Sequence, residues 1–422
     1  MKNEKRLKIA VLGAGISGLG SAYLLSRKHD VDLYEKENRL GGHARTTQVS
    51  ENGKTFGVDT GFLVFNHETY PLLTKLFKEL DVKIENSDMS FAFWNKKTNL
   101  AYNGESLRGM FFQKKNLFSY SHLKMISDIL KFNKKANNDL DTDHADLDLT
   151  LGEYLKDYSY FFKQRYIIPM GASIWSTPSE KMNEFPARTF LHFFKNHGLL
   201  GVDTQHQWLT VSGGSINYVN KISEFISGKI IKNSDVISVE REDDEVVLVH
   251  EDNSRSVYDK VIFAMHAPDA LKLIDEPTID ELNILSCFEY KENKALLHND
   301  TKALYPNKDV YAAWNYKTNE KDDNKTDENV TLSYWINRLQ NLKSKKEYFV
   351  SLNETQKIDK VIEEISYEHP QFDVKAIDAQ SKRNVINGKN NTYFAGAYWR
   401  YGFHEDGLYS ANTIAQEFGC EL

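Results

Sequence analysis

Three glycines near the N-terminus have a spacing that suits the binding of phosphate groups. Gly13, Gly15 and Gly18 form a G-x-G-x-x-G pattern directly after the mostly apolar run LKIAVL. In such a loop the first glycine permits a tight turn, the second lets a pyrophosphate approach the backbone, and the third lets a helix pack close to a strand. The positive end of that helix faces the phosphates. A glycine turn that serves only strand-to-helix packing is the alternative.

The elements around these glycines favour a dinucleotide. Residues 7–12 predict a strand, residues 19–27 a helix, and residues 31–34 a second strand that ends at Glu35. Glu35 follows Gly15 by about twenty residues, so its carboxylate is placed to accept hydrogen bonds from a ribose diol. An acid at this position argues against a 2′-phosphate. The other predicted contacts of this unit are Ala14, Ser17 and Lys36.

Segments beyond this unit narrow the choice of cofactor. Residues 39–45 read RLGGHAR, residues 58–62 read VDTGF, and a predicted strand at 392–395 precedes Gly396 and a predicted helix at 408–418. With these segments the whole chain resembles the flavin-dependent amine oxidoreductase superfamily, which includes monoamine oxidases, phytoene desaturases and a polyunsaturated fatty acid isomerase. It is most similar to a branch associated with modified fatty acids such as cyclopropane and furan fatty acids. That similarity is carried by VDTGFLVFN, IWSTP, FFKNHGLL, TVSGGSINYV, LLHND and GAYWRYGFHEDGL.

The resemblance implies FAD as the cofactor and an α/β (α+β) fold, in which a Rossmann-like FAD-binding domain of the amine oxidase type accompanies a discontinuous substrate domain. It places the backbone of Gly41, Gly42 and Arg45 along the pyrophosphate and ribityl region, and Gly61 near the isoalloxazine. The backbone of Val236 would meet the adenine. The remaining cofactor contacts that it implies are Thr60, Gly396, Glu405, Asp406 and Gly407.

Two of the residues in these segments have an ordinary alternative. Arg45 is also compatible with a solvated cation on a loop. Asp59 is also compatible with a helix N-cap or a turn, because aspartate prefers such positions.

The chain is long enough for more than one domain. Its 422 residues suggest two or three domains at roughly 150 residues each. We predict an FAD-binding domain made of residues 1–65, 206–275 and 385–422, in which alternating runs at 236–264 form a β-meander. Residues 66–205 and 276–384 would form the substrate domain. Within it we expect helices at 70–79, 119–135, 151–165, 186–196 and 358–365, strands at 295–298 and 331–336, and surface loops at 136–148 and 319–329.

Composition excludes several function classes. The net charge of −7 argues against a broad nucleic-acid-binding surface. The two cysteines, Cys287 and Cys420, exclude a disulfide framework and a cysteine-based metal site, and we expect no metal. The sequence lacks the ~18–20 uninterrupted apolar residues of a membrane span. We therefore expect a cytoplasmic protein, with possible peripheral contact at the inner membrane face.

That peripheral contact rests on residues 108–135, from Arg108 to Lys135. The segment contains seven Lys or Arg residues and one acid, Asp128, interleaved with large apolar residues such as Phe118 and Leu130. A basic amphipathic helix beside apolar anchors can lie in a membrane interface. The alternative is a helix that packs on the core and exposes a basic face, since a helix at any domain surface looks amphipathic.

In a flavoprotein the cofactor carries the redox chemistry, and the protein supplies orientation and electrostatics. We therefore expect hydride transfer from an activated C–H to flavin. His404, Phe403 and Glu405 are the candidate catalytic residues, because the resemblance sets them against the flavin. A scattered histidine is more often a hydrogen-bonded structural residue. We interpret the following four in that way: His43, His67, His266 and His298.

Departures from the amine oxidases point to a different substrate. Monoamine oxidases flank the amine with two aromatic rings. Here one of the matching segments, residues 380–391, has no aromatic residue, and the other ring matches Phe403 only if one residue is inserted. The polar residues usual after the last-strand glycine are replaced by Ala397 and Tyr398. The departures therefore weaken the prediction of amine oxidation, and they leave the prediction of FAD unchanged.

A lipid-like substrate fits these departures better. Aromatic residues of the first insertion could line an apolar channel: Phe91, Phe93, Trp94, Phe161, Phe162, Trp175, Phe190, Phe193 and Phe194. We expect oxidation, meaning desaturation, or double-bond isomerisation of an unsaturated or methylated fatty acyl chain. The alternative is a flavin amine oxidase that acts on a primary amine or polyamine, and a third possibility is a non-enzymatic flavin-binding protein.

Overall fold

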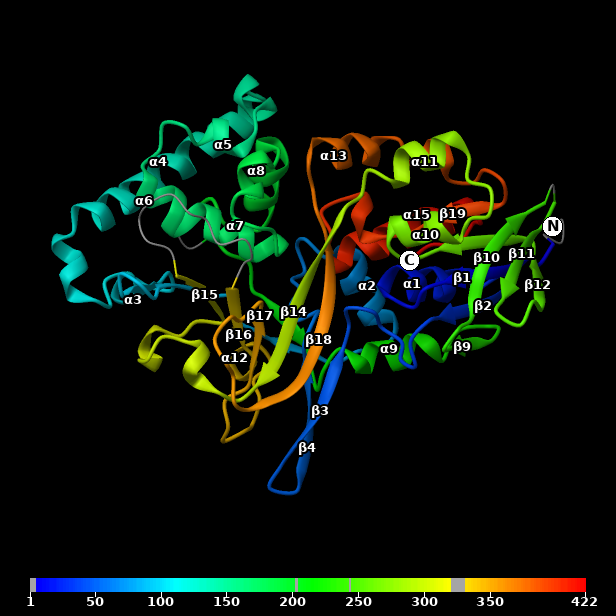
Figure 1. The fold of residues 1–422 in the computed structure, drawn as a ribbon, viewed down its shortest axis with the longest axis horizontal. Helices are drawn as coiled ribbons and strands as arrows, with labels where there is room; N and C mark the ends of the chain where they lie inside the picture. The colour runs from blue at the N-terminus through cyan, green and yellow to red at the C-terminus, as the bar shows by residue number, and fades with distance from the viewer. Residues whose placement is uncertain (1–4, 202–203, 243, 320–330) are drawn as a thin grey trace.

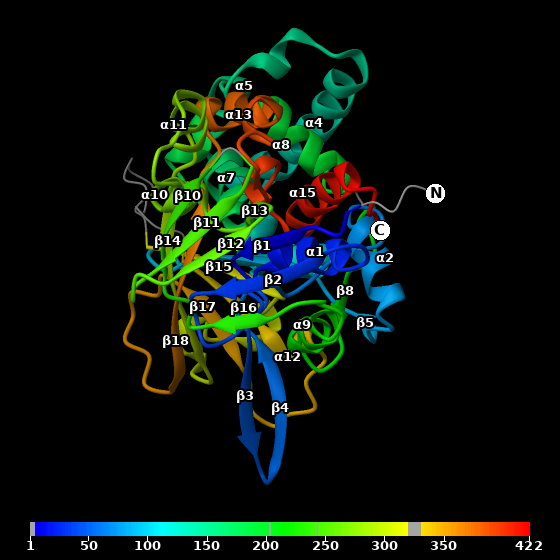
Figure 2. The same cartoon turned by 90° about the vertical axis from the view of Figure 1, so that its right-hand side faces the viewer.

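The computed structural model describes residues 5–201, 204–242, 244–319 and 331–422. One half of the molecule contains a parallel sheet (Figure 1). Its strand β1 is buried from Ile9 to Leu12, which explains why it is a continuous apolar run rather than an alternating one. Helices α1 and α15 pack against each other beside this sheet (Figure 2). The order across the sheet is β19 (Thr392–Phe394), β13 (Lys260–Phe263), β1 (Lys8–Leu12), β2 (Asp30–Glu35) and β9 (Ile230–Lys232).

The two helices beside the parallel sheet come from opposite ends of the chain. Helix α1 (Ile16–Leu25) follows the glycine loop, and α15 (His404–Glu417) ends the chain. A Cβ atom on Gly20 would lie 2.8 Å from Cδ1 of Leu408, so the helices approach too closely for any side chain at that point. The predicted strand–glycine–helix–strand unit and the predicted C-terminal helix are both present.

An antiparallel meander leads into the sheet, as the alternating runs predict. Its strands are β10 (Val236–Arg241), β11 (Val246–His250) and β12 (Arg255–Tyr258), and β13 follows directly. All strands of the parallel sheet and the meander lie within the three segments predicted for the FAD-binding domain. The boundaries of that domain stay a prediction.

A mixed sheet occupies the other half of the molecule. Its strands come only from the two predicted insertions, and β14 and β18 run antiparallel along its edge, between the parallel sheet and the helices α3–α8 (Figure 1). The order is β18 (Val361–Pro370), β14 (Tyr290–His298), β17 (Phe349–Leu352), β16 (Thr331–Trp335), β15 (Trp314–Thr318), β6 (Phe91–Asn95) and β7 (Leu100–Asn103).

Helices of the first insertion cover the mixed sheet on one side (Figure 1). The longest of those described there, α4 (Tyr120–Thr142), has Ser119 as its N-cap, and its buried face includes Met125 and Phe132. Helix α2 (Pro71–Glu79) of this insertion packs instead against α15 beside the parallel sheet. The others are α3 (Leu107–Met110), η1 (Lys114–Phe118), η2 (Ala145–Asp148), α5 (Leu151–Tyr154), α6 (Tyr160–Phe162), η3 (Lys163–Ile167), α7 (Ile168–Trp175), η4 (Lys181–Glu184) and α8 (Ala187–Asn196).

Short elements complete the fold. A hairpin of β3 (Thr46–Glu51) and β4 (Lys54–Asp59) projects from the molecule (Figure 2), and β5 (Ile84–Asn86) pairs with β8 (Leu209–Val211). Among the described residues, no helix is both long enough and apolar enough to span a bilayer. The remaining helices are α9 (Ile216–Ser223), α10 (Ala267–Leu273), α11 (Ile279–Leu285), η5 (Thr301–Ala303), η6 (Lys308–Val310), α12 (Ile336–Leu339), α13 (Val374–Ser381), α14 (Arg383–Ile386) and η7 (Ala397–Trp399).

The helix predicted at 358–365 is wrong. This stretch leads into strand β18, which pairs with β14 from Val361 to Pro370. Inward positions alternate along it, with Ile365 and Tyr367 buried and Ser366 exposed between them. The ladder of backbone hydrogen bonds with β14 outweighs the helix preference of the adjacent residues Glu363 and Glu364.

Two further predictions about the first insertion need correction. The helix expected at 151–165 breaks, because Ser159 starts a new helix: its hydroxyl accepts from Phe162 N–H at 3.3 Å. Part of the surface loop expected at 136–148 is helix, because α4 continues to Thr142. Asp139 is neutralised there by an ion pair with Lys135 and by a hydrogen bond from the hydroxyl of Tyr154. The loop expected at 319–329 falls outside the described residues after position 319.

Candidate functional site

A cavity of about 1800 Å³ runs from the glycine loop at the start of α1 to the helices α3 and α4. These ends lie on opposite sides of the β14–β18 pair in Figure 1. We call the part near the glycine loop, Glu35 and the start of α15 the cofactor limb. We call the part lined by α3, α4, α7 and strand β6 the apolar limb; its lining includes Phe91, Leu107, Ile126, Ile129, Leu130 and Met170.

The three glycines of the loop have different reasons to lack a side chain. Gly13 has φ +103°, and a Cβ there would lie 2.4 Å from the carbonyl oxygen of Ala264. A Cβ on Gly18 would lie 1.8 Å from the carbonyl oxygen of Gly13. A Cβ on Gly15 would meet no protein atom within 4 Å. Packing therefore requires Gly13 and Gly18, whereas Gly15 leaves open space at the helix start, as a phosphate-binding loop needs.

The start of α1 is also suited to an anion. Gly15 is the N-cap and offers no side chain to the first-turn N–H groups, although every residue of α1 is buried. A buried helix start without a side-chain cap favours a ligand that accepts from those N–H groups. The start of α15 lies close by, because a Cβ on Gly407 would be 2.8 Å from Oγ of Ser17.

Glu35 lines the cofactor limb beside this helix start. The N–H of Ala14 donates to Oε2 of Glu35 at 2.8 Å, and the N–H of Glu37 donates to Oε1 at 2.9 Å. These bonds hold the carboxylate next to the loop and leave lone pairs for further donors. A dinucleotide with its phosphates at α1 and its ribose at Glu35 therefore fits the residues present.

Most of the sequence-predicted site residues line the cavity. Those that do are Gly13, Ala14, Gly15, Ser17, Glu35, Lys36, Gly42, Arg45, Gly61, Val236, Gly396, Phe403 and His404. Gly18, Gly41, Thr60, Glu405, Asp406 and Gly407 lie behind the lining. These six support the wall: the N–H of Gly41 donates to the carbonyl of Ala14 at 2.8 Å, and the hydroxyl of Thr60 lies 2.8 Å from that of Tyr367.

Glu405 and Asp406 cap helices. The N–H groups of Leu72 and Leu73, at the start of α2, each donate to the carboxylate of Glu405 at 2.9 Å. Asp406 accepts from the N–H of Phe403 at the start of α15. Burial raises the pKa of Glu405 to about 7 and that of Asp406 to about 6. Their contacts are structural, and the predicted catalytic role of Glu405 stays a prediction.

His404 faces the cavity in its neutral form. Its ring stacks on Phe62 with centroids 3.8 Å apart, and its Nε2 lies 2.9 Å from the hydroxyl of Tyr218. Burial lowers the pKa of His404 to about 3, so it does not carry a proton near neutral pH. These contacts hold the ring in place, and the predicted catalytic role of His404 stays a prediction.

Three further histidines lie at the cofactor limb, and two of them had been interpreted as structural. His43 stacks on Tyr367 at 5.0 Å and His369 lies 5.4 Å from His43, while His266 stacks on Tyr290. All three line the cavity, and burial lowers the pKa of each. His43 could have been found from its place in the RLGGHAR segment. His67 and His298 lie elsewhere, bonded to Thr74 and Ser351.

Arg45 and Asp59 each have a defined partner. Arg45 forms an ion pair with Glu363 of β18, so it is not a free loop cation. Asp59 is buried and accepts from the N–H of Ser215, the N-cap of α9, and from the amide of Gln340 at 3.0 Å. Burial raises its pKa to about 6. Asp59 ends strand β4 and is not itself an N-cap, but its carboxylate accepts at the start of α9.

An aromatic cluster lies where the two limbs join. Phe403 stacks on Phe193 of α8 with centroids 4.9 Å apart, and Phe193 stacks on His197 at 3.8 Å. Burial lowers the pKa of His197 to about 4. Sequence reasoning did not single out His197, although it lies in the FFKNHGLL segment. Of the nine aromatic residues expected to line a channel, Phe91 and Phe193 do so and the others pack elsewhere.

The sequence pattern of the family described as flavin containing amine oxidoreductase matches residues 16–285. The chain belongs to that family. It is therefore an FAD-dependent oxidoreductase, and the open space at Gly15, the uncapped helix start and Glu35 are the features that fit FAD. The predicted fold class, cofactor and superfamily are confirmed.

Similar proteins in this family have different substrates. A 4,4'-diapophytoene desaturase from Staphylococcus aureus is 32% identical over 96 residues, which is 19% of this chain and 19% of that protein. A CLA-producing fatty acid isomerase from P. acnes has a similar structure, with a TM-score of 0.71, 16% identity and coverage of 99% of this chain and 100% of that one. A putrescine oxidase bound to putrescine has a TM-score of 0.67, 14% identity and coverage of 98% and 99%. At these identities the structural matches establish the fold alone.

Proposed function

We propose that this flavoenzyme moves a hydride from an activated C–H of an unsaturated or methyl-branched fatty acyl chain, and so moves or adds a double bond. The observation that carries the proposal is the apolar limb, which continues the cofactor limb within one cavity. Ligand pockets typically measure about 300–1000 Å³. The cavity of about 1800 Å³ therefore has room for a dinucleotide and a second long ligand in series.

The lining of the apolar limb suits a hydrocarbon. Aliphatic side chains of α4, such as Ile126 and Ile129, face Met170 and Ile174 of α7 across it. Among the described residues, no Lys or Arg lines this limb. The cations that line the cavity lie elsewhere, beside the glycine loop and β18, and Lys272 lies on α10. The carboxylates of Asp88 and Glu105 at its wall are both paired with Arg338. A charged substrate end would be poorly solvated inside it.

Bound FAD supplies the ability to accept a hydride and to return it. The chain's own residues hold the reactants and exclude water. The glycine loop and Glu35 hold the dinucleotide, and the stacked rings of Phe193 and Phe403 keep the junction dry. Neutral His404 fixes Phe62 beside the junction. In an isomerisation the hydride returns to another carbon of the same chain, so no external oxidant is required. Desaturation also releases a proton from the neighbouring carbon to water, and it requires an electron acceptor.

Anaerobic mixing of the flavin-loaded protein with acyl lipids and with amines tests the proposal. We expect a new or moved double bond in the extracted lipid, with flavin bleaching if the reaction is a desaturation. The alternative, a flavin amine oxidase for primary amines or polyamines, receives less support, because residues 380–391 offer no aromatic ring to pair with Phe403, which stacks on Phe193 instead. Rapid bleaching by amines, with no change in any acyl lipid, would establish that alternative.

The predicted peripheral membrane contact through residues 108–135 is a separate expectation, and the proposed acyl chemistry does not depend on it. An acyl chain resides in membranes, so an enzyme that acts on it gains from contact with a bilayer.

A further inference from the structure

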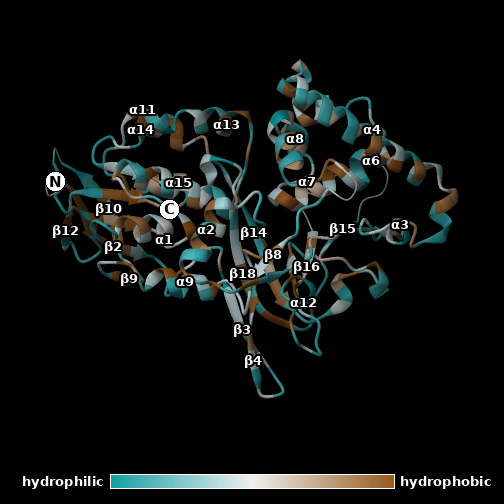
Figure 3. Cartoon of the chain, turned by 180° about the vertical axis from the view of Figure 1, so that it is seen from behind, coloured by the Kyte–Doolittle hydropathy of each residue, from teal (hydrophilic) through white to brown (hydrophobic). Residues whose placement is uncertain are grey.

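Large apolar side chains are exposed at the end of the molecule formed by α3, η1 and the first half of α4. Phe118 is 90% exposed, Leu107 80% and Tyr120 75%. Three more lie within the same residues: Leu117, Leu123 and Leu130. The ribbon of this end alternates between hydrophobic and hydrophilic residues (Figure 3). Contiguous exposed apolar residues on a folded protein mark an interaction site more often than a scattered single residue does.

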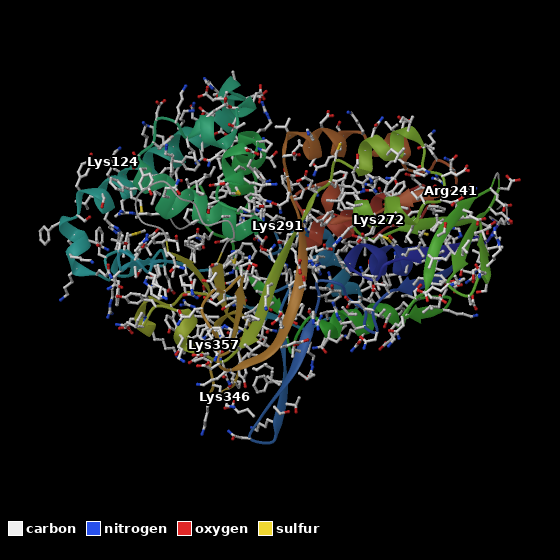
Figure 4. All side chains as sticks on the ribbon, in the orientation of Figure 1. Lys124, Arg241, Lys272, Lys291, Lys346 and Lys357 are labelled. Atoms are coloured by element: carbon white, nitrogen blue, oxygen red, sulfur yellow. The ribbon has the colours of Figure 1, made fainter. Side chains whose placement is uncertain are left out.

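Basic side chains without carboxylate partners lie among these apolar ones. Lys124 and Lys135 pair with acids of their own helix, and Figure 4 labels Lys124 at the outer edge of α4. For four exposed cations of this end, the structure records no ion pair in the part of the chain that it describes: Arg108, Lys114, Lys115 and Lys134. Because the whole chain has a net charge of −7, this cationic end differs from the average surface.

The exposed apolar end coincides with the mouth of the apolar limb. Leu107 and Leu130 are exposed to solvent and also line the cavity, so the cavity reaches the surface between α3 and α4. Ile126 and Ile129, the less exposed neighbours of Leu130 on α4, also line the cavity. Helix α4 thus packs on the core with one face, lines the cavity with a second and exposes a third.

We propose that this end is a docking face for an anionic phospholipid surface, from which the acyl chain enters between Leu107 and Leu130. The docking face consists of Leu107, Leu117, Phe118, Tyr120, Leu123 and Leu130 with Arg108, Lys114, Lys115 and Lys134. The proposal extends the proposed function, because an acyl substrate gives the docking its purpose. Docking itself requires no turnover and can be measured separately.

The chemistry of the docking face favours a bilayer over a protein partner. Its apolar side chains are exposed on α3, η1 and α4, which suits shallow insertion among acyl chains and needs no complementary pocket. The cations around them match anionic headgroups. A second copy of the chain would bring the same lysines together and be repelled. An acidic carrier protein would match the cations, but it would leave Phe118 without a hydrocarbon environment.

Flotation with vesicles of fully saturated phosphatidylglycerol and phosphatidylcholine tests the charges of the docking face without any reaction. We expect the full-length, FAD-loaded protein to float with anionic vesicles, to float weakly with pure phosphatidylcholine, and to dissociate as salt is raised. Lys114→Glu with Lys115→Glu should lower the partition coefficient about 30-fold or more, at ~1 kcal/mol for each basic residue lost. Lys345→Glu with Lys346→Glu is the matched control, an exposed lysine pair at the lower edge in Figure 4, and should float like the wild type.

A second pair of variants tests the apolar side chains. Leu117→Ser with Phe118→Ser should lower partitioning about 10-fold or more, because side chains that would insert no longer leave water. Ile279→Ser with Val374→Ser removes two side chains of similar exposure, 68% and 62%, from another face and should change nothing.

The outcomes separate docking from turnover. The docking face is overturned if vesicle flotation is unchanged in both the Lys114/Lys115 and the Leu117/Phe118 variants. It is also overturned if the control variants reduce flotation equally. Stable binding to an acidic acyl carrier protein with no binding to vesicles would assign the face to a protein instead. Acyl chemistry without any docking would overturn this inference and leave the proposed function standing. Docking without acyl chemistry would overturn the proposed function and leave the docking face standing.

Discussion

The two limbs of the cavity are built in different ways. Backbone forms much of the cofactor limb, at the glycine loop, Gly42 and Gly61, and at Gly15 the absence of a side chain leaves open space. Side chains form the apolar limb, from helices α3, α4 and α7, and there the shape depends on how those helices pack. Short sequence motifs therefore determine the shape of the cofactor limb. Contacts between residues far apart in the chain determine the shape of the apolar limb.

The largest effect that this comparison predicts is at Gly15. Gly15→Val should weaken FAD affinity ~100-fold or more while the protein still folds, because a side chain there meets no protein atom and Gly15 has φ −71°, which any residue can adopt. The added atoms would occupy the space where a phosphate approaches the helix start. Titration of the apoprotein with FAD, followed by flavin fluorescence, measures the change.

Gly18→Ala is the contrasting variant, since its Cβ would lie 1.8 Å from the carbonyl oxygen of Gly13 and should destabilise the fold itself. If Gly15→Val binds FAD normally, the cofactor limb is not the phosphate site.

A smaller loss is expected at Glu35. Glu35→Ala should weaken FAD binding by roughly 1.5–3 kcal/mol, the usual value of a hydrogen bond to a charged group. The carboxylate also accepts from the N–H groups of Ala14 and Glu37, so the loop loses some order as well. Isothermal titration with FAD gives the affinity, and excess FAD should restore the thermal unfolding midpoint. Unchanged affinity would make Glu35 a strand-end residue only.

A bulky residue in the apolar limb should affect the substrate and spare the cofactor. Ile129→Trp should slow the reaction of long acyl chains about 10-fold, through steric blocking worth about 1.4 kcal/mol, and leave FAD affinity unchanged. Ser127→Trp, on the exposed face of the same helix, is the control. Product analysis by gas chromatography across a series of chain lengths measures the effect. Equal slowing by both variants would remove the apolar limb from the substrate path.

The smallest effect concerns Glu405, which lies behind the cavity wall. Burial raises its pKa from the ordinary 4.5 to about 7, so the folded protein holds this proton longer than the unfolded chain does. Its contribution to stability is therefore complete below pH 4.5 and is lost as the pH rises toward 7. From pH 5.5 to 6.5 the wild type should lose ~1 kcal/mol of unfolding free energy relative to Glu405→Gln.

Urea unfolding of the two proteins at the two pH values measures this difference. A parallel pH dependence in both would contradict the titration of Glu405. Flavin affinity and turnover should stay near wild type in Glu405→Gln if the residue only caps α2. A large loss of turnover would instead support the catalytic role that its place in the GFHEDG segment suggested.

The sequence by itself determined the cofactor limb of this protein. Strand, glycine turn, helix and acid follow one another within residues 8–35, so local patterning was sufficient to place the loop, Glu35 and the role of each glycine. The meander before β13 could also be predicted from the sequence, because period-two alternation and turn residues are local signals.

Only the tertiary structure decided the rest, because it depends on contacts between residues far apart in the chain. Strand β18 brings Tyr367 and His369 beside His43, although its glutamate-rich sequence also fits a helix. Phe193 meets Phe403 across about half of the chain length, and the aliphatic face of α4 lines the cavity in place of most of the expected aromatic residues. Which side chains share a cavity is settled by packing, and packing is not encoded in any single segment.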